Sequence, residues 1–425
     1  MREQGFKSSR VQEFKGSKVQ EFKGFKSMPK LVEWDKCCGC AACANKCAKQ
    51  AIAMLPNEEG FLHPVVDEEK CVECGMCEKV CPGLSVANNA QTTPKAYVVQ
   101  HKDDSIRYQS TSGGGFTAIA EEVIRRGGVV FGAVMTDDLT VRHEYVSDTE
   151  GLARFRNSKY VQSEIGDCYR RTRDLLKEGK LVCFSGTPCQ INGLYKFLGK
   201  DYDNLIAVDV VCKSVPSPMI FQKYVEYKRE REGNISDIVF RDKKRGFLYC
   251  TMAHYLTHID RKVGKSVYRR GSESDEWLRL FLSGKISRHS CVTCPYQTKQ
   301  RVGDFTLGDI WETNNPEFDD NRGSTLLHVW TKKGAEFLES IKPNIRWMDY
   351  EIEKSRGTER EHSLKIHPGR AQLFKDAQEL STSQFFARYA PDSLKIKAKQ
   401  TGRYLLWKLS LQNVVRHLKH MVIHR

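Results

Sequence analysis

The chain has 425 residues, of which 40% are hydrophobic and 28% charged, and it contains 16 cysteines. This composition supports hydrophobic cores and excludes wholesale disorder, a collagenous repeat and a low-complexity protein. No apolar run approaches the roughly 18 residues of a membrane-spanning helix, and the N-terminus MREQGFKSSR lacks the apolar core of a secretory signal. We therefore expect a cytoplasmic protein of two or three domains whose cysteines stay reduced.

The formal charge of +15 is concentrated at the two ends of the chain. Residues 1–30 contribute +5 and residues 393–425 contribute +8, which leaves +2 for the residues between them. A nucleic-acid-binding core would carry a basic stripe on its folded surface. The sequence therefore predicts no nucleic-acid partner.

Residues 1–30 contain the sequence VQEFKG twice, at residues 11–16 and 19–24. A repeat this short and polar buries almost no apolar surface, so we expect residues 1–30 to form a disordered, low-complexity tail. Met28 is followed directly by PKLVEWDKCCGC, which favours Met28 as the native start.

Eight cysteines within residues 31–90 form two copies of the spacing C-x2-C-x2-C-x3-C. They are Cys37, Cys40, Cys43 and Cys47, then Cys71, Cys74, Cys77 and Cys81. This is the spacing of bacterial ferredoxins with two 4Fe-4S clusters, in which the fourth cysteine of each run binds the other cluster. The prediction is therefore that Cys81 completes cluster one with Cys37, Cys40 and Cys43, and that Cys47 completes cluster two.

Zinc is the alternative for these thiolates, because it also binds four cysteines. Zinc sites usually pair two C-x2-C hooks, which differs from two runs of four cysteines. The first run departs from the ferredoxin pattern, because Ala48 follows Cys47 where proline is usual. Cys38 is an extra cysteine, and we interpret it as a bystander.

The rest of the chain has the alternating strand and helix patterns of an α/β protein. An Asn/Gln/Thr/Pro stretch over residues 88–94 predicts a linker. Beyond it, β-rich runs such as AYVVQ and KLVCFSG alternate with helical patterns such as FTAIAEEVIRRG. We further expect a helix over residues 219–229 and strands over residues 238–241 and 249–258. The predicted fold class is α+β, with a ferredoxin-like domain (31–90), a larger α/β domain (95–390) and a basic C-terminal helix (393–425).

Four further cysteines lie in distinctive contexts. They are Cys189 in FSGTPCQINGL, Cys212 in VDVVCKSVPSP, and Cys291 with Cys294 in SRHSCVTCPY. Cys189 and Cys212 follow β-rich runs, and strand ends commonly form sites in α/β folds. A C-x2-C hook completed by two separated cysteines suits a third 4Fe-4S cluster. The alternatives are a zinc site formed by the same four residues and a redox-active pair of Cys291 and Cys294.

A glycine-rich turn precedes a helical pattern that begins near Phe116. Its members are Ser110, Ser112, Gly113, Gly114 and Gly115. Hydroxyls and amides at a helix N-terminus can converge on a pyrophosphate, although such a turn is more often only a tight connection. Lys159 is either a partner of such a phosphate or a solvated lysine. Asp304, Gly308 and Asp309 either line the same pocket or form a strand turn.

Six motifs in order resemble those of the coenzyme F420 hydrogenase/dehydrogenase beta-subunit family. They are STSGGGFTAIA, SKYVQS, FSGTPCQINGL, VDVVCKSVPSP, SCVTCPY and RVGDFTLGDIW, within about residues 95–310. The resemblance implies that the larger α/β domain is a flavin-binding domain that holds FAD beside a 4Fe-4S cluster. By the same resemblance the third cluster's ligands are Cys189, Cys212, Cys291 and Cys294. Family members reduce or oxidise deazaflavin, and related branches act on chlorophyll-type substrates.

One motif departs from the family pattern. Where members often have Cys-His-Gly before Val-Pro-Ser, this chain has Cys212, Lys213 and Ser214. The ligand is retained, but a cation replaces a titratable imidazole. A proton-delivery role and the identity of the substrate therefore do not transfer with the resemblance.

From Tyr404, apolar residues recur at helical spacing among lysines and arginines, which predicts an amphipathic helix. They are Trp407, Leu411, Val414, Val415, Leu418 and Val422. Such a helix can lie on an anionic membrane surface, but packing on the body of the chain or on another subunit is the commoner outcome.

Together these features predict an iron-sulfur flavoprotein oxidoreductase. Electrons would pass from a ferredoxin-type donor through 4Fe-4S clusters to FAD, and then to an organic acceptor, either deazaflavin coenzyme F420 or another small molecule. One alternative is a non-catalytic electron-transfer subunit of a larger redox complex, and another is a structural cluster protein without flavin. The sequence identifies no proton donor.

Overall fold

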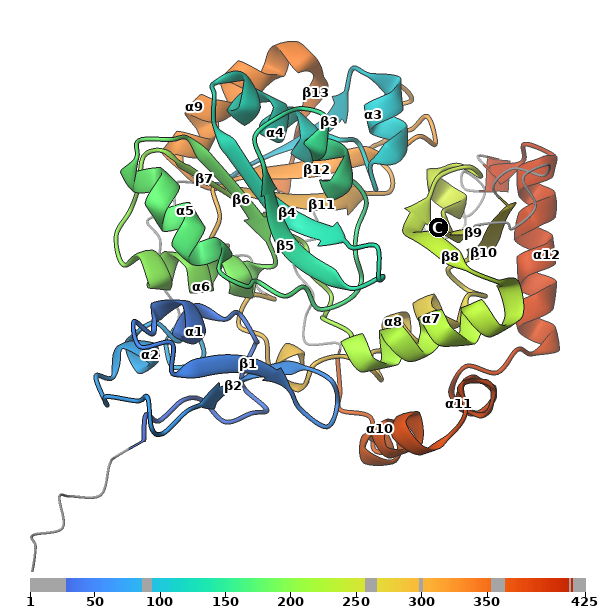
Figure 1. Ribbon diagram of the computed structural model, residues 1–425. Helices are drawn as coiled ribbons and strands as arrows, with labels where there is room; N and C mark the ends of the chain where they lie inside the picture. The colour runs from blue at the N-terminus through green and yellow to red at the C-terminus, as the bar shows by residue number, and fades with distance from the viewer. Residues whose placement is uncertain are drawn as a thin grey trace, which may run out of the picture.

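The computed structural model describes residues 28–85, 94–256, 266–297, 301–352, 364–412 and 414–415. Most of the expected N-terminal tail, and residues 416–425 of the expected C-terminal helix, lie outside the described residues. Figure 1 shows a small N-terminal domain, in blue, against a large sheet that is flanked by helices. A smaller sheet and the C-terminal helices lie beside the large sheet, at the right of the view.

The N-terminal domain contains two very short helices and one hairpin. Its elements in order are α1 (Ala42–Lys46), β1 (Ile52–Pro56), β2 (Leu62–Val66) and α2 (Met76–Lys79), with β1 and β2 antiparallel. Each helix begins after a residue in the left-handed region, Ala41 at φ 61° and Gly75 at φ 65°. Helices this short are not stable alone, so packing must hold the cysteine-bearing loops in place.

Eight strands form one mixed sheet in the order β13-β3-β12-β11-β7-β6-β4-β5. Their bounds are β3 (Lys95–His101), β4 (Val129–Met135), β5 (Val141–Val146), β6 (Val182–Gly186), β7 (Leu205–Val210), β11 (Phe305–Ile310), β12 (Ser324–Val329) and β13 (Ile345–Tyr350). The neighbours β4, β6, β7 and β11 are parallel, and the outer strands pair antiparallel. Parallel strands are buried on both faces, which explains near-continuous apolar runs such as LVCF and LIAV.

Helices cover both faces of this sheet. The helix α4 (Gly115–Arg125), preceded by α3 (Asp104–Gln109), packs with α9 (Lys332–Ile341) on one face. The helices α5 (Cys168–Lys177) and α6 (Pro188–Leu198) pack on the other. Side chains alternate between the two cores along a strand, as Cys183 and Phe184 of β6 show. The α/β texture predicted from the sequence is confirmed.

A second core lies under the smaller sheet. The strands β8 (Ile235–Asp242), β9 (Thr251–Leu256) and β10 (Ser266–Gly271) form an antiparallel sheet in the order β10-β9-β8. Around it pack α7 (Pro218–Glu232), α8 (Glu276–Ser283), α10 (Arg370–Glu379) and α11 (Thr382–Tyr389). The helix predicted over residues 219–229 is α7, and the strands predicted nearby are β8 and β9.

The C-terminal helix is shorter than the predicted segment. The helix α12 (Leu394–Lys408) begins after Ser393, whose side chain accepts a hydrogen bond from the Ile396 N–H, and the chain turns at Ser410 with φ 58°. The helix α12 contacts the segment between β8 and β9, where Arg403 donates to the Leu248 carbonyl at 2.6 Å. Packing on the body of the chain is thus observed. Within the described ranges, no helix is both long and apolar enough to cross a bilayer.

Polar contacts fix the N-terminal domain to the rest of the chain. The Arg170 guanidinium donates to the carbonyls of Ala44 and Asn45, both at 3.0 Å, and so holds the end of α1 against α5. On the other side, the Arg370 guanidinium binds both carboxylate oxygens of Glu59, at 2.5 and 2.6 Å. The cysteine loops are therefore clamped between two parts of the larger body.

We expect Gly60→Ala to loosen this attachment. Gly60 has φ 78°, and a Cβ there would lie 2.3 Å from the Cβ of Met219 in α7. Gly179→Ala is the matched control, because Gly179 also has φ 78° but its Cβ would meet nothing within 4 Å. In both variants the free energy of unfolding should fall by about 1–2 kcal/mol, because alanine is strained in the left-handed region. The free energy of unfolding of Gly60→Ala should fall by about 1–3 kcal/mol more than that of the control, because of the clash. Anaerobic chemical denaturation measures both values. An equal loss in the two variants would contradict the close docking.

Candidate iron-sulfur and flavin site

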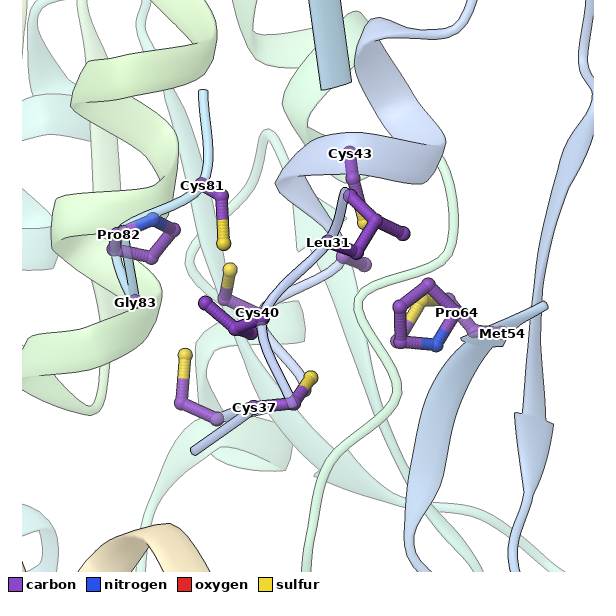
Figure 2. Close-up of a pocket in the computed structure, with 13 residues that line it drawn as sticks. Leu31, Cys37, Cys40, Cys43, Met54, Pro64, Cys81, Pro82 and Gly83 are labelled. Atoms are coloured by element: carbon purple, nitrogen blue, oxygen red, sulfur yellow. The ribbon is translucent and has the colours of Figure 1, made fainter. Parts of the chain in front are cut away.

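Five cysteines of the N-terminal domain line one cavity (Figure 2), and four of them belong to the two predicted ferredoxin runs. Cys37, Cys40 and Cys43 reach it from the loop and first turn of α1, and Cys81 reaches it from the segment after α2. The remaining walls are largely apolar and include Leu31, Val32, Met54, Pro64 and Pro82. The structure thus groups three cysteines of the first run with the fourth of the second run.

This cavity fits a cubane by its donor set and its surroundings. Burial raises the pKa of the Cys37 thiol and raises that of Cys43 to about 12. Cluster assembly would therefore have to displace thiol protons. Among the described residues, no three His, Cys, Asp or Glu side chains converge on a single ion. A cubane does not require such convergence, because its four thiolates bind four different irons.

The second predicted set lies nearer the surface. Cys47 and Cys77 belong to one apolar cluster with Ile52, and the Ala51 N–H donates to the Cys47 sulfur at 3.3 Å. Cys74 is close enough for its charge to raise the pKa of Cys77, which burial raises first. Cys71 is partly buried, whereas Cys74 is exposed. This set therefore opens to solvent, while the cavity set is mostly enclosed.

The third set comes together from three loops. Cys189 follows β6 and Cys212 follows β7, and because these strands are parallel neighbours both residues lie at the carboxyl edge of the large sheet. The loop with Cys291 and Cys294 lies opposite, where the Val215 N–H donates to the Cys291 sulfur at 3.4 Å.

Burial dominates the electrostatics of this third set. It raises the pKa of Cys212 well above its usual range, that of Cys291 to about 12 and that of Cys294 to about 11. The charge of Cys189 raises each of these pKa values further, so all four sulfurs lie within mutual electrostatic reach.

Cys38 lies between the first and third sets. It lines the cavity, and its thiol lies close enough to those of Cys189 and Cys40 for them to shift its pKa. Cys189 lowers the pKa of Cys38, but Cys40 and burial raise it, and the result lies well above the usual range. The residue interpreted from sequence as a bystander thus joins two of the cysteine sets.

The glycine-rich turn lies at the same edge of the sheet. The Thr325 hydroxyl contacts the Ser112 hydroxyl at 2.9 Å and accepts from the Gly113 N–H at 2.9 Å. Thr325 is the strand partner of Asp309. A Cβ at Gly113 would lie 2.3 Å from the Val99 carbonyl oxygen, so only glycine fits there.

Part of this turn serves local structure. Gly114, at φ 86°, allows the turn into α4, and the Gly115 N–H also points to the Thr325 hydroxyl at 3.4 Å. The Ser110 hydroxyl donates to the Ile106 carbonyl at 2.8 Å. These contacts are those of a tight connection, the alternative that the sequence left open.

Lys159 is partly buried beside the turn. The neighbouring Ser158 N–H donates to the Thr111 hydroxyl at 2.7 Å. The Lys159 ammonium donates to the carbonyls of Arg154 and Arg156, both at 2.9 Å. Burial lowers the pKa of Lys159 to about 7. It is therefore not a solvated lysine, the second reading that the sequence allowed.

Asp309 faces the smaller sheet and pairs with a residue that the sequence reasoning missed. The Arg241 Nη1 of β8 donates to Asp309 at 2.7 Å, and the guanidinium lies over the rings of Trp311 and Phe247 at 5.2 and 5.5 Å. Arg241 is 8% exposed, and its Nη2 is buried with no hydrogen-bond partner among the described residues. An orphaned donor beside a half-exposed tryptophan is the type of group that binds a flat, polar ring.

The motif RVGDFTLGDIW does not bring Asp304 to this place. It spans the whole of β11, so Asp304 and Asp309 lie about 16 Å apart along the strand. Asp304 accepts from the Ala207 N–H at 2.8 Å and the Thr331 hydroxyl at 2.6 Å, which is a structural role. Gly308 packs against Val211, beside the Cys212 loop, where a Cβ would lie 2.9 Å from a Val211 methyl.

Lys213, which replaces the family's histidine, is directed away from the cysteines. Its ammonium donates to the Leu282 carbonyl near the end of α8 and lies 5.9 Å from the centre of the Phe281 ring. The substitution therefore places a cation against α8.

Comparison with known proteins bears on both halves of the chain. Residues 36–83 match the 4Fe-4S dicluster domain, and residues 179–353 match the C terminus of the coenzyme F420 hydrogenase/dehydrogenase beta subunit. These matches confirm the resemblance drawn from the motifs.

Individual relatives cover parts of the chain. An uncharacterized polyferredoxin-like protein of Methanocaldococcus jannaschii is 39% identical over 69 residues, which are 14% of this chain and 41% of that protein. An uncharacterized protein of the same organism is 26% identical over 216 residues, 42% of this chain and 59% of that protein. The chain thus spans well under two thirds of these curated relatives.

One solved structure is also similar. A chain of the F420-reducing NiFe hydrogenase complex from Methanosarcina barkeri aligns with 16% identity and a TM-score of 0.42, over 68% of this chain and 90% of that one.

Double variants test the crossed grouping. Each cysteine-to-alanine change that removes one cubane should lower the iron content from about 12 to about 8 per chain. We expect the pair Cys37→Ala and Cys81→Ala to lose no more iron than either change alone, because both remove the same cluster. The pair Cys37→Ala and Cys47→Ala should lose two clusters. Iron analysis after anaerobic purification measures this, with Cys168→Ala as a control, and additive loss in the first pair would contradict the grouping.

Proposed function

We propose a function for this chain, which matches a 4Fe-4S dicluster domain over residues 36–83 and the C terminus of the coenzyme F420 hydrogenase/dehydrogenase beta subunit over residues 179–353. It is an iron-sulfur flavoprotein oxidoreductase that takes electrons from a ferredoxin-type donor and delivers them, through three 4Fe-4S clusters and FAD, to an organic acceptor. The observation that carries this proposal is the succession of three cysteine sets from an exposed surface to the carboxyl edge of the sheet.

The succession gives each set a place in the route. The exposed Cys74 makes its set the entry point for a donor protein. Cys43 of the cavity set lies within electrostatic reach of Cys77, and Cys38 connects the cavity set with Cys189. When bound, the clusters supply one-electron relay and FAD converts single electrons into a two-electron transfer. The cysteines hold the clusters, and the apolar walls keep water away from the cavity set.

The flavin proposal rests on the residues between the two sheets. Arg241 offers an unpaired buried donor and Trp311 offers a half-exposed ring. Asp309 holds the Arg241 side chain in place through the 2.7 Å ion pair. Lys159, Ser110, Ser112 and the glycines at 113–115 remain the proposed neighbours of the FAD phosphates. Their place at the edge that carries Cys189 and Cys212 supports a flavin next to the third cluster.

The acceptor is proposed as deazaflavin coenzyme F420 or another small molecule. The matching domain is described as that of a hydrogenase/dehydrogenase subunit. That description also favours a second candidate, in which the chain is a non-catalytic electron-transfer subunit and a partner holds the acceptor site.

Anaerobic purification of the full chain tests the first candidate. We expect iron, sulfide and flavin in the isolated protein, and reduction of an added acceptor by reduced ferredoxin without any other protein. Turnover that requires a partner would support the second candidate. Colourless protein, or protein with zinc in place of iron, would overturn both.

A pH titration tests the role of Lys159. Its pKa of about 7 means that the ammonium is charged below neutral pH and neutral above it, whereas burial lowers the pKa of the nearby His143 to about 4 and keeps that ring neutral. We expect the affinity of flavin-depleted protein for FAD to fall about tenfold between about pH 6 and pH 8. Lys159→Arg should remove the pH dependence. Fluorescence titration measures the affinity, and a flat wild-type profile would contradict the phosphate role.

A further inference from the structure

Arg288 is buried against the loop that carries the first cysteine set. Its side chain is 2% exposed, and its Nε donates to the Cys37 carbonyl at 2.6 Å. Its Nη2 donates to the Leu62 carbonyl at 2.9 Å and contacts the His63 Nε2 at 3.0 Å. A Cβ at Gly39 would lie 2.8 Å from the Arg288 Nη1, so the glycine leaves room for the guanidinium.

The backbone of Arg288 belongs to the third cysteine set. Its N–H donates to the Val215 carbonyl at 2.7 Å, three residues after Cys212. Its own carbonyl accepts from the Cys291 N–H at 3.1 Å. One residue therefore extends from the scaffold of the third set into the loop of the first.

The charge of Arg288 has no carboxylate partner in the part of the chain that the structure describes. A buried cation without an anion is costly, so a negative group is expected within its reach. Burial raises the pKa of Cys37 and of Cys291, and the charge of Arg288 opposes both rises. The sulfurs of the two sets are thus the anionic groups that this cation can stabilise.

We propose that Arg288 is a positioning residue shared by two clusters, and that its charge raises the reduction potentials of the cluster at Cys37 and the cluster at Cys189 together. The inference rests on the proposed function, because it requires those clusters. A cubane with four thiolates becomes more negative by one charge when it is reduced. A fixed cation in a poorly solvated interior favours that reduced state. Since one cation raises both potentials, the difference between the reduction potentials of the two clusters stays small.

The test is a potentiometric titration of the anaerobic holoprotein followed by EPR. We expect Arg288→Met to lower the reduction potentials of two of the three clusters by about 59 mV each. This is about a tenfold shift of a one-electron equilibrium toward the oxidised form. The exposed set with Cys74 should keep its potential. Arg288→Lys should keep both potentials close to those of the wild-type protein, because lysine retains the positive charge. Arg107→Met is the matched control, since Arg107 is equally buried but pairs with Asp320 at 2.6 Å.

A second variant keeps the arginine in place. The Gln162 Oε1 lies 3.4 Å from the Arg288 Nη1 and accepts from the Leu62 N–H at 3.0 Å, and a glutamate oxygen can make both contacts. Gln162→Glu should therefore neutralise Arg288 and lower the same two potentials, even if Arg288→Met fails to assemble. Clusters with unchanged potentials, or a shift in only one of them, would overturn the inference and leave the proposed function standing. Absence of the clusters from the wild-type protein would overturn the proposed function.

Discussion

The architecture depends on holding a small cysteine-rich domain in a fixed place against the carboxyl edge of a large sheet. Electron transfer between two clusters requires that their ligands stay close, and a flexible linker alone cannot provide this. The chain meets the requirement with guanidinium groups. Arg170, Arg288 and Arg370 each reach from the larger body to backbone carbonyls or a carboxylate of the N-terminal domain. Their planar, multiply donating heads hold two surfaces in one relative orientation.

The same edge of the sheet gathers buried cations whose partners are mostly carbonyl oxygens. Lys159 binds two carbonyls, and Lys243 binds three, at Arg107, Ser112 and Arg322. Burial lowers the pKa of Lys243 to about 7, as it does for Lys159. Their direct hydrogen-bond partners are neutral, although carboxylates nearby, Asp237 for Lys159 and Asp309 for Lys243, oppose the lowering of the pKa. When these lysines are protonated, this edge of the larger domain offers a positive environment to a phosphorylated ligand.

Sequence reasoning was strongest where a pattern is local. The spacing of the cysteines predicted that Cys81 joins Cys37, Cys40 and Cys43, and these four line one cavity in the fold. The apolar runs predicted β6 and β7 with a cysteine after each. Sequence reasoning was weaker at predicting which residues, far apart along the chain, lie close together in the fold. The two aspartates of RVGDFTLGDIW fall at opposite ends of one strand, which the motif alone does not show. Arg241 lies in a strand whose sequence carries no recognisable motif. Cys38 approaches Cys189 only because the N-terminal domain packs on the larger domain.

The outermost cysteine set and the cavity set differ in burial, and this difference decides which thiolates oxidants reach first. Cys74 is exposed while Cys37, Cys40 and Cys43 are buried, so oxidants reach the outermost set first. On the proposed electron route, this damage would first break the connection with the donor. A sample that still holds its inner clusters would then already be disconnected from its electron supply.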